Sequence, residues 1–339
     1  MNLIFICGNN ELESHVVSKQ NEPDFPLLKY LDSLVDSLRK LIASAVTGEN
    51  EESVHHARVA TRRLKAATDL LKPAISNRCR RPFNRVTRLL RRQLGPLRDL
   101  DVMIEHLAEF KQPKNQSAVE WLSARLGSLR QETVKNAAEQ APPARMLARL
   151  GTWWGLRHEI EESRDQIADL VAESVHLQLD AFVEQADDLV GARHNDPHQL
   201  RIAGKSLRYT LELAKENGAR LPSSVGSQFK KMQTALGLWH DYIVLTERIM
   251  SESVASDLAL HNPALQGDIL GLAQTTLKRS ESQMKKMATM WQTRGPSLTQ
   301  TIRQAFPLTK HADVPEETEA PVIENSPTPI AESPSAPAA

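Results

Sequence analysis

The residues best suited to chemistry in this sequence are basic side chains repeated at helical spacing between His55 and Arg98. This stretch holds thirteen Lys or Arg residues and one acid, Asp69, although the whole 339-residue chain carries 42 basic and 42 acidic residues. Charge separated this strongly within a neutral protein is typical of a surface that binds an anionic partner. Arginine suits phosphate in particular, because its planar fork donates two parallel hydrogen bonds and stays charged.

Two rows of basic residues follow the periodicity of an α-helix. The first row flanks an apolar stripe and consists of His55, Arg58, Arg62 and Lys65. The second row would extend about 16 Å along one helix face at 1.5 Å per residue, and it consists of Arg81, Arg85, Arg88 and Arg92. Like charges four residues apart weaken their own helix by a few tenths of a kcal/mol per pair, roughly. A bound anion is therefore the expected counterpart of these rows.

The first row returns later in the chain. Its counterparts, 143 positions further on, are His198, Arg201, Lys205 and Arg208. A shorter motif, Leu-Gly-x-x-x-Asp at 94–99, returns at 236–241 with an offset of 142. Two matches at nearly one offset indicate an internal duplication. In the second copy, the region equivalent to the arginine row has only two basic residues, Lys230 and Lys231. We therefore expect the first half of the chain to dominate anion binding.

Helices must position these residues, and the sequence predicts an all-α fold. Aromatic residues make up 4% of the chain, and no stretch alternates in the way that a strand requires. We expect eight principal helices, four per repeat, in antiparallel four-helix bundles with short loops. Pro82 should open the third helix, Gly95 and Pro96 should break or kink the chain, and Pro197 should begin a helix with Asp196 as its N-cap.

The two ends of the chain differ in composition from its middle. Residues 1–25 are predicted to be a flexible N-terminal arm. Residues 306–339 are acidic and rich in proline, with too little apolar surface to offset the entropy of ordering, so we predict a disordered tail. Between them, repeat one covers about 26–155 and repeat two about 156–305.

Cysteine usage and the first residues indicate the compartment. Cys7 and Cys79 make neither a disulfide framework nor a Cys-x-x-Cys motif, which suits a reducing environment. The first residues do not resemble a secretory signal, and no apolar run is long enough to span a bilayer. We expect a cytoplasmic protein without a membrane partner.

The duplicated motifs also resemble a known family. Paired His-x-x-Arg-x-x-x-Arg/Lys helices, each followed by a Leu-Gly-x-x-x-Asp corner, are similar to the CHAD family (conserved histidine α-helical domain), and the resemblance covers roughly residues 26–300. It implies two antiparallel four-helix bundles related by internal pseudo-twofold symmetry. It also implies a basic surface that binds inorganic polyphosphate, and association with polyphosphate granules.

We therefore expect a polyphosphate-binding protein that is not an enzyme and holds no cofactor or metal. The predicted contact residues are His55, Arg58, Arg62, Lys65, Arg81, Arg85, Arg88, Arg92, Arg98, His198, Arg201, Lys205, Arg208, Lys230 and Lys231. For His55 and His198, phosphate contact, structural packing and metal ligation are three alternatives, although their spacing forms no metal motif. Asp99 and Asp241 are expected to orient basic side chains or to cap helices. Tyr209 and the tryptophans are expected in the core.

Two other functions remain as alternatives. A nucleic-acid-binding module would explain the charge, but base-stacking aromatic residues do not interleave with the basic rows. An enzyme acting on phosphoanhydrides or phosphohistidine, or an accessory to one, would need an activated nucleophile or carboxylates that hold Mg²⁺. The sequence shows neither arrangement. Chain-length preference and protein partners stay open.

Overall fold

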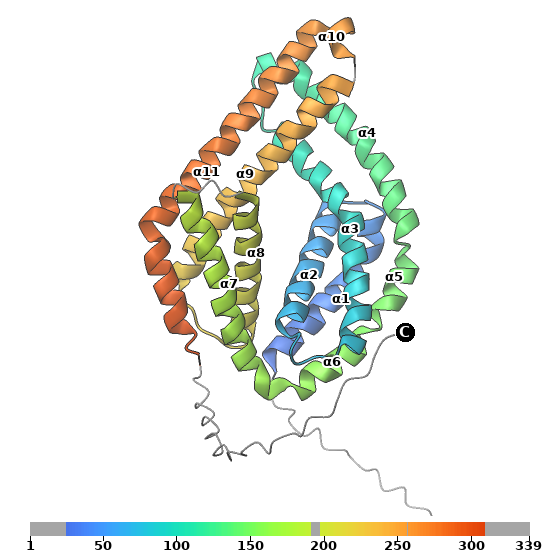
Figure 1. Cartoon of the computed structure of the whole chain (residues 1–339). Helices are drawn as coiled ribbons and strands as arrows, with labels where there is room; N and C mark the ends of the chain where they lie inside the picture. The colour runs from blue at the N-terminus through green and yellow to red at the C-terminus, as the bar shows by residue number, and fades with distance from the viewer. Residues whose placement is uncertain (1–24, 191–196, 256, 309–339) are drawn as a thin grey trace, which may run out of the picture. The chain divides into compact units, whose positions relative to one another are not determined.

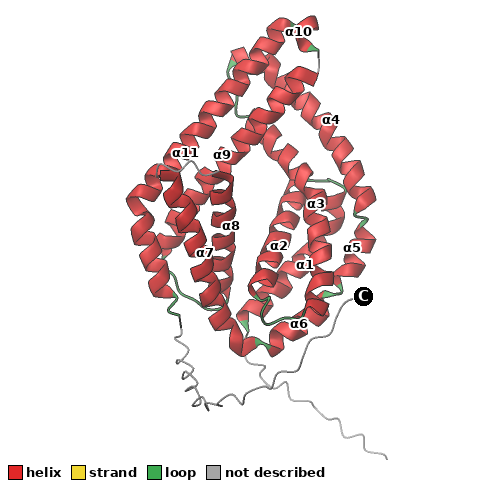
Figure 2. Ribbon diagram, viewed as in Figure 1, coloured by secondary structure: helices red, strands yellow, loops and turns green. Residues whose placement is uncertain are grey.

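The computed structural model describes residues 25–190, 197–255 and 257–308. Within these ranges every regular element is a helix (Figure 2), which confirms the all-α prediction. The long helices in chain order are α1 (Pro26–Val46), α2 (Glu51–Leu70), α3 (Asn77–Leu107), α4 (Gln116–Gln140), α7 (Ile167–Val190), α8 (Pro197–Glu216), α9 (Ser223–Ala255) and α11 (Pro263–Ala305). The short elements are α5 (Pro143–Leu150), α6 (Trp153–Glu162), α10 (Leu258–His261) and the 3₁₀ turns Pro113–Asn115 and Arg164–Gln166.

The helices of the first repeat pack in chain order. Helix α1 contacts α2, α2 contacts α3 and α3 contacts α4, while α5 and α6 cover α1 and α3 (Figure 1). The apolar stripe of α1 is fully buried, as Leu38 and Ile42 show. Asn50 caps α2 by accepting a hydrogen bond from the Ser53 backbone N–H at 2.6 Å. Local capping and an amphipathic pattern thus define these helices before tertiary packing orders them.

The second repeat packs α7 against α8, α8 against α9, and α11 against both α9 and α7. Phe182 lies at the centre of this bundle, with ring centroids 5.3 Å from Phe229 and 5.4 Å from Trp291. In the first repeat Phe83 contacts Trp153 with centroids 5.3 Å apart. Each repeat thus packs a tryptophan against phenylalanine in its core. The pseudo-twofold symmetry itself stays a prediction.

A second, separate core joins the two repeats. It lies where the last turns of α3 and the first turns of α4 meet three other segments, near the top of Figure 1. These segments are the end of α9, the short helix α10 and the start of α11. Its buried members include Leu107, Leu122, Leu126, Leu245, Ile249 and Leu272. An ion pair between Arg125 of α4 and Glu252 of α9, at 2.8 Å, also crosses between the repeats. The bundles are therefore packed together through apolar contacts as well as through the site described below.

Two expectations about α3 meet the structure differently. Helix α3 begins at Asn77, where the Ser76 hydroxyl accepts from the Cys79 N–H at 3.3 Å, so Pro82 lies inside the helix rather than at its start. The same helix continues through Gly95 and Pro96, so they do not break it, and the alternative of a kink there stays a prediction. Both prolines are exposed, so the carbonyls that lose a partner face water, while buried neighbours hold the helix in register.

Other expectations meet the structure in part. Helix α8 does begin at Pro197, whereas its predicted cap, Asp196, lies outside the described residues. Of the predicted arm 1–25 and tail 306–339, residues 1–24 and 309–339 lie outside them as well, but Phe25 and Phe306 are buried in the core, so the core extends beyond both predicted boundaries. Trp153 and Trp291 are buried as expected, but Trp154 is 62% exposed. No helix in the described ranges is long and apolar enough to cross a membrane.

Candidate functional site

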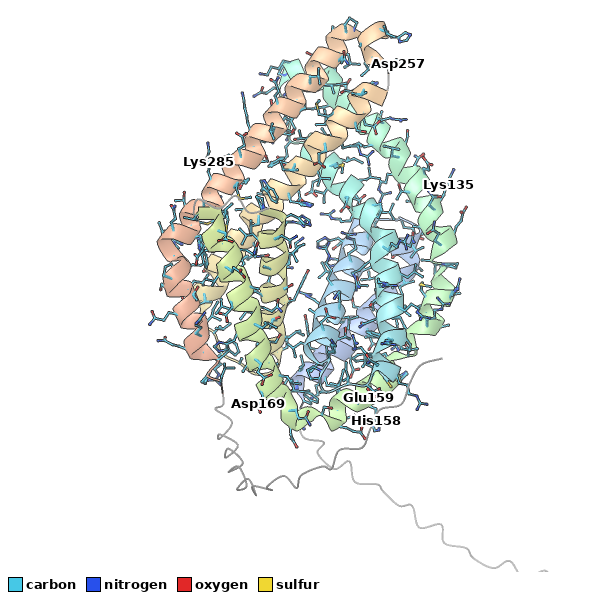
Figure 3. All side chains as sticks on the ribbon, viewed as in Figure 1. Lys135, His158, Glu159, Asp169, Asp257 and Lys285 are labelled. Carbon is cyan, nitrogen blue, oxygen red and sulfur yellow. The ribbon has the colours of Figure 1, made fainter. Side chains whose placement is uncertain are left out.

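A cavity of about 730 Å³ lies between the two repeats, walled by α2, α7 and α8 with one side chain from α3. Side chains extend from these helices into the space between α2 and α8 (Figure 3). Six Lys or Arg residues and one His line it: Arg62, Lys65, Lys72, Arg91, Arg201, Lys205 and His198. We call this the basic cavity. It brings both copies of the duplicated basic motif to one place.

Helix periodicity explains why these side chains reach the cavity. Leu64 on α2 and Leu207 on α8 are buried in their own bundles. Arg62 precedes Leu64 by two residues, and Lys205 precedes Leu207 by two residues. Each basic residue therefore lies about 160° around its helix from the buried leucine. Arg91 is held differently, because its guanidinium donates a hydrogen bond to the Thr61 carbonyl of α2 at 2.8 Å. The buried stripes of α2 and α8 therefore determine which basic residues face each other.

The basic groups raise one another's electrostatic energy. Burial, together with the nearby positive charges of Arg201 and Arg62, lowers the pKa of Lys205 to about 7. Burial likewise lowers the pKa of Arg58 to about 10, with Arg62 adding to the effect. The pKa of Arg91 and that of Arg201 are lowered mainly by burial too. A bound anion would relieve both the desolvation and the repulsion.

Two aspartates offset part of this charge, one from each copy of the Leu-Gly-x-x-x-Asp motif. Asp99 pairs with Arg58, with a nitrogen–oxygen distance of 3.6 Å. Asp241 acts against burial by raising the pKa of Arg201 and of Lys205. The arrangement agrees with aspartates that orient basic side chains. Among the described residues no group of three or more His, Cys, Asp or Glu side chains is placed to hold a metal ion.

The two motif histidines occupy different surroundings. His198 is the second residue of α8, lines the basic cavity and stacks on His240 with ring centroids 5.7 Å apart. His55 is exposed, lies in the second turn of α2 and is outside the cavity wall. Burial, then the charge of Arg98, lowers the pKa of His55. Of the two, His198 is the one placed to meet a ligand in the cavity.

The arginine row of α3 lies beside the cavity rather than in it. All four members, Arg81, Arg85, Arg88 and Arg92, are exposed and outside the cavity wall. In helical projection they lie about 60–120° from Arg91, which faces α2. Arg88 is near enough to Arg91 to lower the pKa of the latter. The row thus continues the positive surface outward from the cavity.

The remaining predicted contacts are more dispersed. Arg98 lies 3.5 Å from Glu105 in an ion pair, and Arg208 is exposed with its guanidinium 4.8 Å from the Tyr209 ring centroid. Lys230 and Lys231 are exposed on α9, outside the cavity wall. Their roles stay predictions.

The list of predicted contacts omitted several wall residues, among them the basic Lys72 and Arg91. Arg91 lies seven residues after Asn84, which bonds Thr68 of α2 at 2.8 Å, so both lie on the face of α3 that meets α2. Tyr209 was assigned to the core; it is buried, as expected, but it also lines the cavity.

The chain belongs to the CHAD family, since the CHAD domain model matches residues 29–250. The crystal structure of the CHAD domain from the plant Ricinus communis is similar, with a TM-score of 0.54 and 18% sequence identity over 83% of this chain and 90% of that chain. At this identity the likeness concerns the fold. CHAD domains are associated with polyphosphate binding in general. No curated protein sequence matches the chain significantly.

Proposed function

We propose that this protein binds inorganic polyphosphate in the basic cavity and along the arginine row of α3, without catalysing its breakdown. The observation that supports the proposal is the basic cavity itself, in which six Lys or Arg side chains line one space, four of them from the two copies of the motif. We propose polyphosphate granules as the place where this binding occurs.

Many modest contacts would hold a flexible polyanion there. Each arginine donates paired hydrogen bonds to phosphate oxygens, and the contacts add because they act on one chain. The lowered pKa values of Lys205 and Arg58 support this, since they indicate positive charges held together at a cost that a ligand would remove. The arginine row would then hold the part of the chain that leaves the cavity.

The test compares salt dependence of polyphosphate affinity among three charge-removal variants. The cavity variant carries Arg62→Gln, Arg201→Gln and Lys205→Gln. The row variant carries Arg81→Gln, Arg85→Gln, Arg88→Gln and Arg92→Gln. The matched control carries Lys135→Gln and Lys285→Gln, two exposed residues on α4 and α11 that point away from the cavity (Figure 3).

Counterion release makes log affinity fall linearly with log salt, with a slope that follows the number of phosphates contacted. We expect a flatter slope and weaker binding for the cavity and row variants, and a wild-type slope for the control. Replacing Lys230 and Lys231 should have a smaller effect than the row variant. Equal slopes for all proteins, with circular dichroism showing intact helices, would refute the proposal.

Two further measurements separate the alternatives. Competition of polyphosphate against RNA and duplex DNA distinguishes a polyphosphate protein from a nucleic-acid-binding module, which would prefer the nucleic acids. Metal-dependent release of phosphate from polyphosphate by the pure protein, abolished by one point mutation, would show an enzyme instead.

A further inference from the structure

Part of the lining of the basic cavity has a chemistry that a bare polyphosphate does not need. Apolar side chains from α2, the turn after it, α7 and α8 line the cavity beside the basic residues: Leu70, Pro73, Leu170, Leu177 and Ile202. Leu177 and Ile202 are 67% and 45% exposed, so these large aliphatic groups face the open space. An aliphatic wall facing water in a binding cavity gains free energy only when a ligand covers it.

Two acidic residues line the same cavity. Asp69, at the end of α2, and Glu173, on α7, both line the cavity. Asp69 forms an ion pair with Lys65. Carboxylates repel a phosphate chain, but they accept hydrogen bonds from hydroxyl and amino groups. A neutral group with such donors therefore fits this region better than more phosphate does.

The part of the wall that α7 supplies holds no basic side chain. It consists of Leu170, Glu173, Ser174, Leu177 and Gln178, whereas the Lys and Arg residues come from α2, the turn after it, α3 and α8. Neutral polar side chains at Ser206 and Thr210 also line the wall. The volume, about 730 Å³, lies within the range of sites that bind small organic molecules.

We propose that the basic cavity binds nucleoside oligophosphates, with the phosphates against Arg62, Arg201 and Lys205 and the nucleoside against Leu177 and Ile202. The inference rests on the proposed anion-binding role of the same basic residues and adds a ligand class to it. The aliphatic pair covers the faces of the base, and the carboxylates of Asp69 and Glu173 accept from its amino group or from the ribose hydroxyls.

The experiment compares ATP with inorganic tripolyphosphate, which has the same number of phosphates and lacks the nucleoside. Calorimetric or fluorescence titration gives the affinity of the full-length protein for each ligand. The test variant carries Leu177→Ser and Ile202→Ser. The control variant carries Leu260→Ser, an equally apolar change at an 81% exposed position on α10. Because all three residues are exposed, the fold should tolerate these changes, and thermal melting checks it.

We expect wild-type protein and the Leu260→Ser control to bind ATP about tenfold more tightly than tripolyphosphate, which corresponds to about 1.4 kcal/mol. The Leu177→Ser/Ile202→Ser variant should lose this preference and keep its affinity for tripolyphosphate. Equal affinities for the two ligands in the wild type, or a preference that survives in the test variant, would overturn the inference.

The outcomes also separate this inference from the proposed function. If long polyphosphate and tripolyphosphate bind but ATP shows no preference, polyphosphate binding stands and the nucleoside site does not exist. If ATP binds while long polyphosphate does not, the proposed function fails and the cavity is a nucleotide site. If none of the three ligands binds, both proposals are refuted.

Discussion

At the scale of the residue, Lys205 is the group most altered by the fold. Burial lowers its pKa to about 7, and positive charges on its own helix (Arg201, Arg208) and on α2 (Arg62) act in the same direction, while Asp241 of α9 opposes them. His198 lines the same cavity and stacks on His240. A lysine in this state gains a proton when an anion binds beside it.

Polyphosphate affinity should therefore depend on pH. Below about pH 7 Lys205 is already protonated in the free protein, so affinity is at its full value. As pH rises above this value, binding must take up a proton, and affinity should fall by up to about tenfold per pH unit. Titrations between pH 6 and 9 at constant ionic strength measure the effect.

The variant Lys205→Arg provides the control, because arginine keeps its charge throughout this range. It should remove the part of the pH dependence that belongs to Lys205. A pH profile identical to that of the wild type would show that Lys205 does not contact the ligand.

At the scale of the element, the sequence predicted helix faces better than helix ends. The basic stripes of α2 and α8 share a cavity because the apolar stripes of these two helices are buried in separate bundles. The helical periodicity of the sequence was sufficient to predict both the basic and the apolar stripes. Local rules failed at Pro82 and Pro96, which lie inside α3 beside the fully buried Phe83 and Leu97. Nor could single-helix patterns show that α7 supplies Leu177 to the wall, because this depends on how the repeats pack.

Gly48, between α1 and α2, is a position where the backbone requires glycine. Its φ is +64°, and a Cβ would lie 2.5 Å from the Val134 side chain of α4. Gly48→Ala should cost about 2–4 kcal/mol, from the left-handed backbone and from overpacking. Gly127→Ala, within α4 and with open space around it, should instead stabilise by about 0.5–1 kcal/mol. Chemical unfolding measures both, and equal free energies of unfolding would contradict the close contact.

At the scale of the whole molecule, the ends of the chain are predicted to contribute nothing to the core. Residues 311–339 lie outside the described residues, and their composition lacks a core-forming pattern. A chain without them should melt at the temperature of the full-length protein. A clear drop in the melting temperature would show that the segment packs, and tighter polyphosphate binding after truncation would show that it competes for the basic surface.

The two repeats should unfold together, because the second core takes side chains from both. Leu122 of α4 is fully buried there against residues of α3, α9 and α11. Leu122→Ala should lower the free energy of unfolding by about 2–5 kcal/mol and keep a single transition, since the loss weakens a contact that both bundles share. Leu260→Ala, at an exposed position, should have little effect. Far-UV circular dichroism and tryptophan fluorescence should give coincident curves. Two separate transitions would show that each bundle is stable alone, in which case a cavity walled by both could open without unfolding.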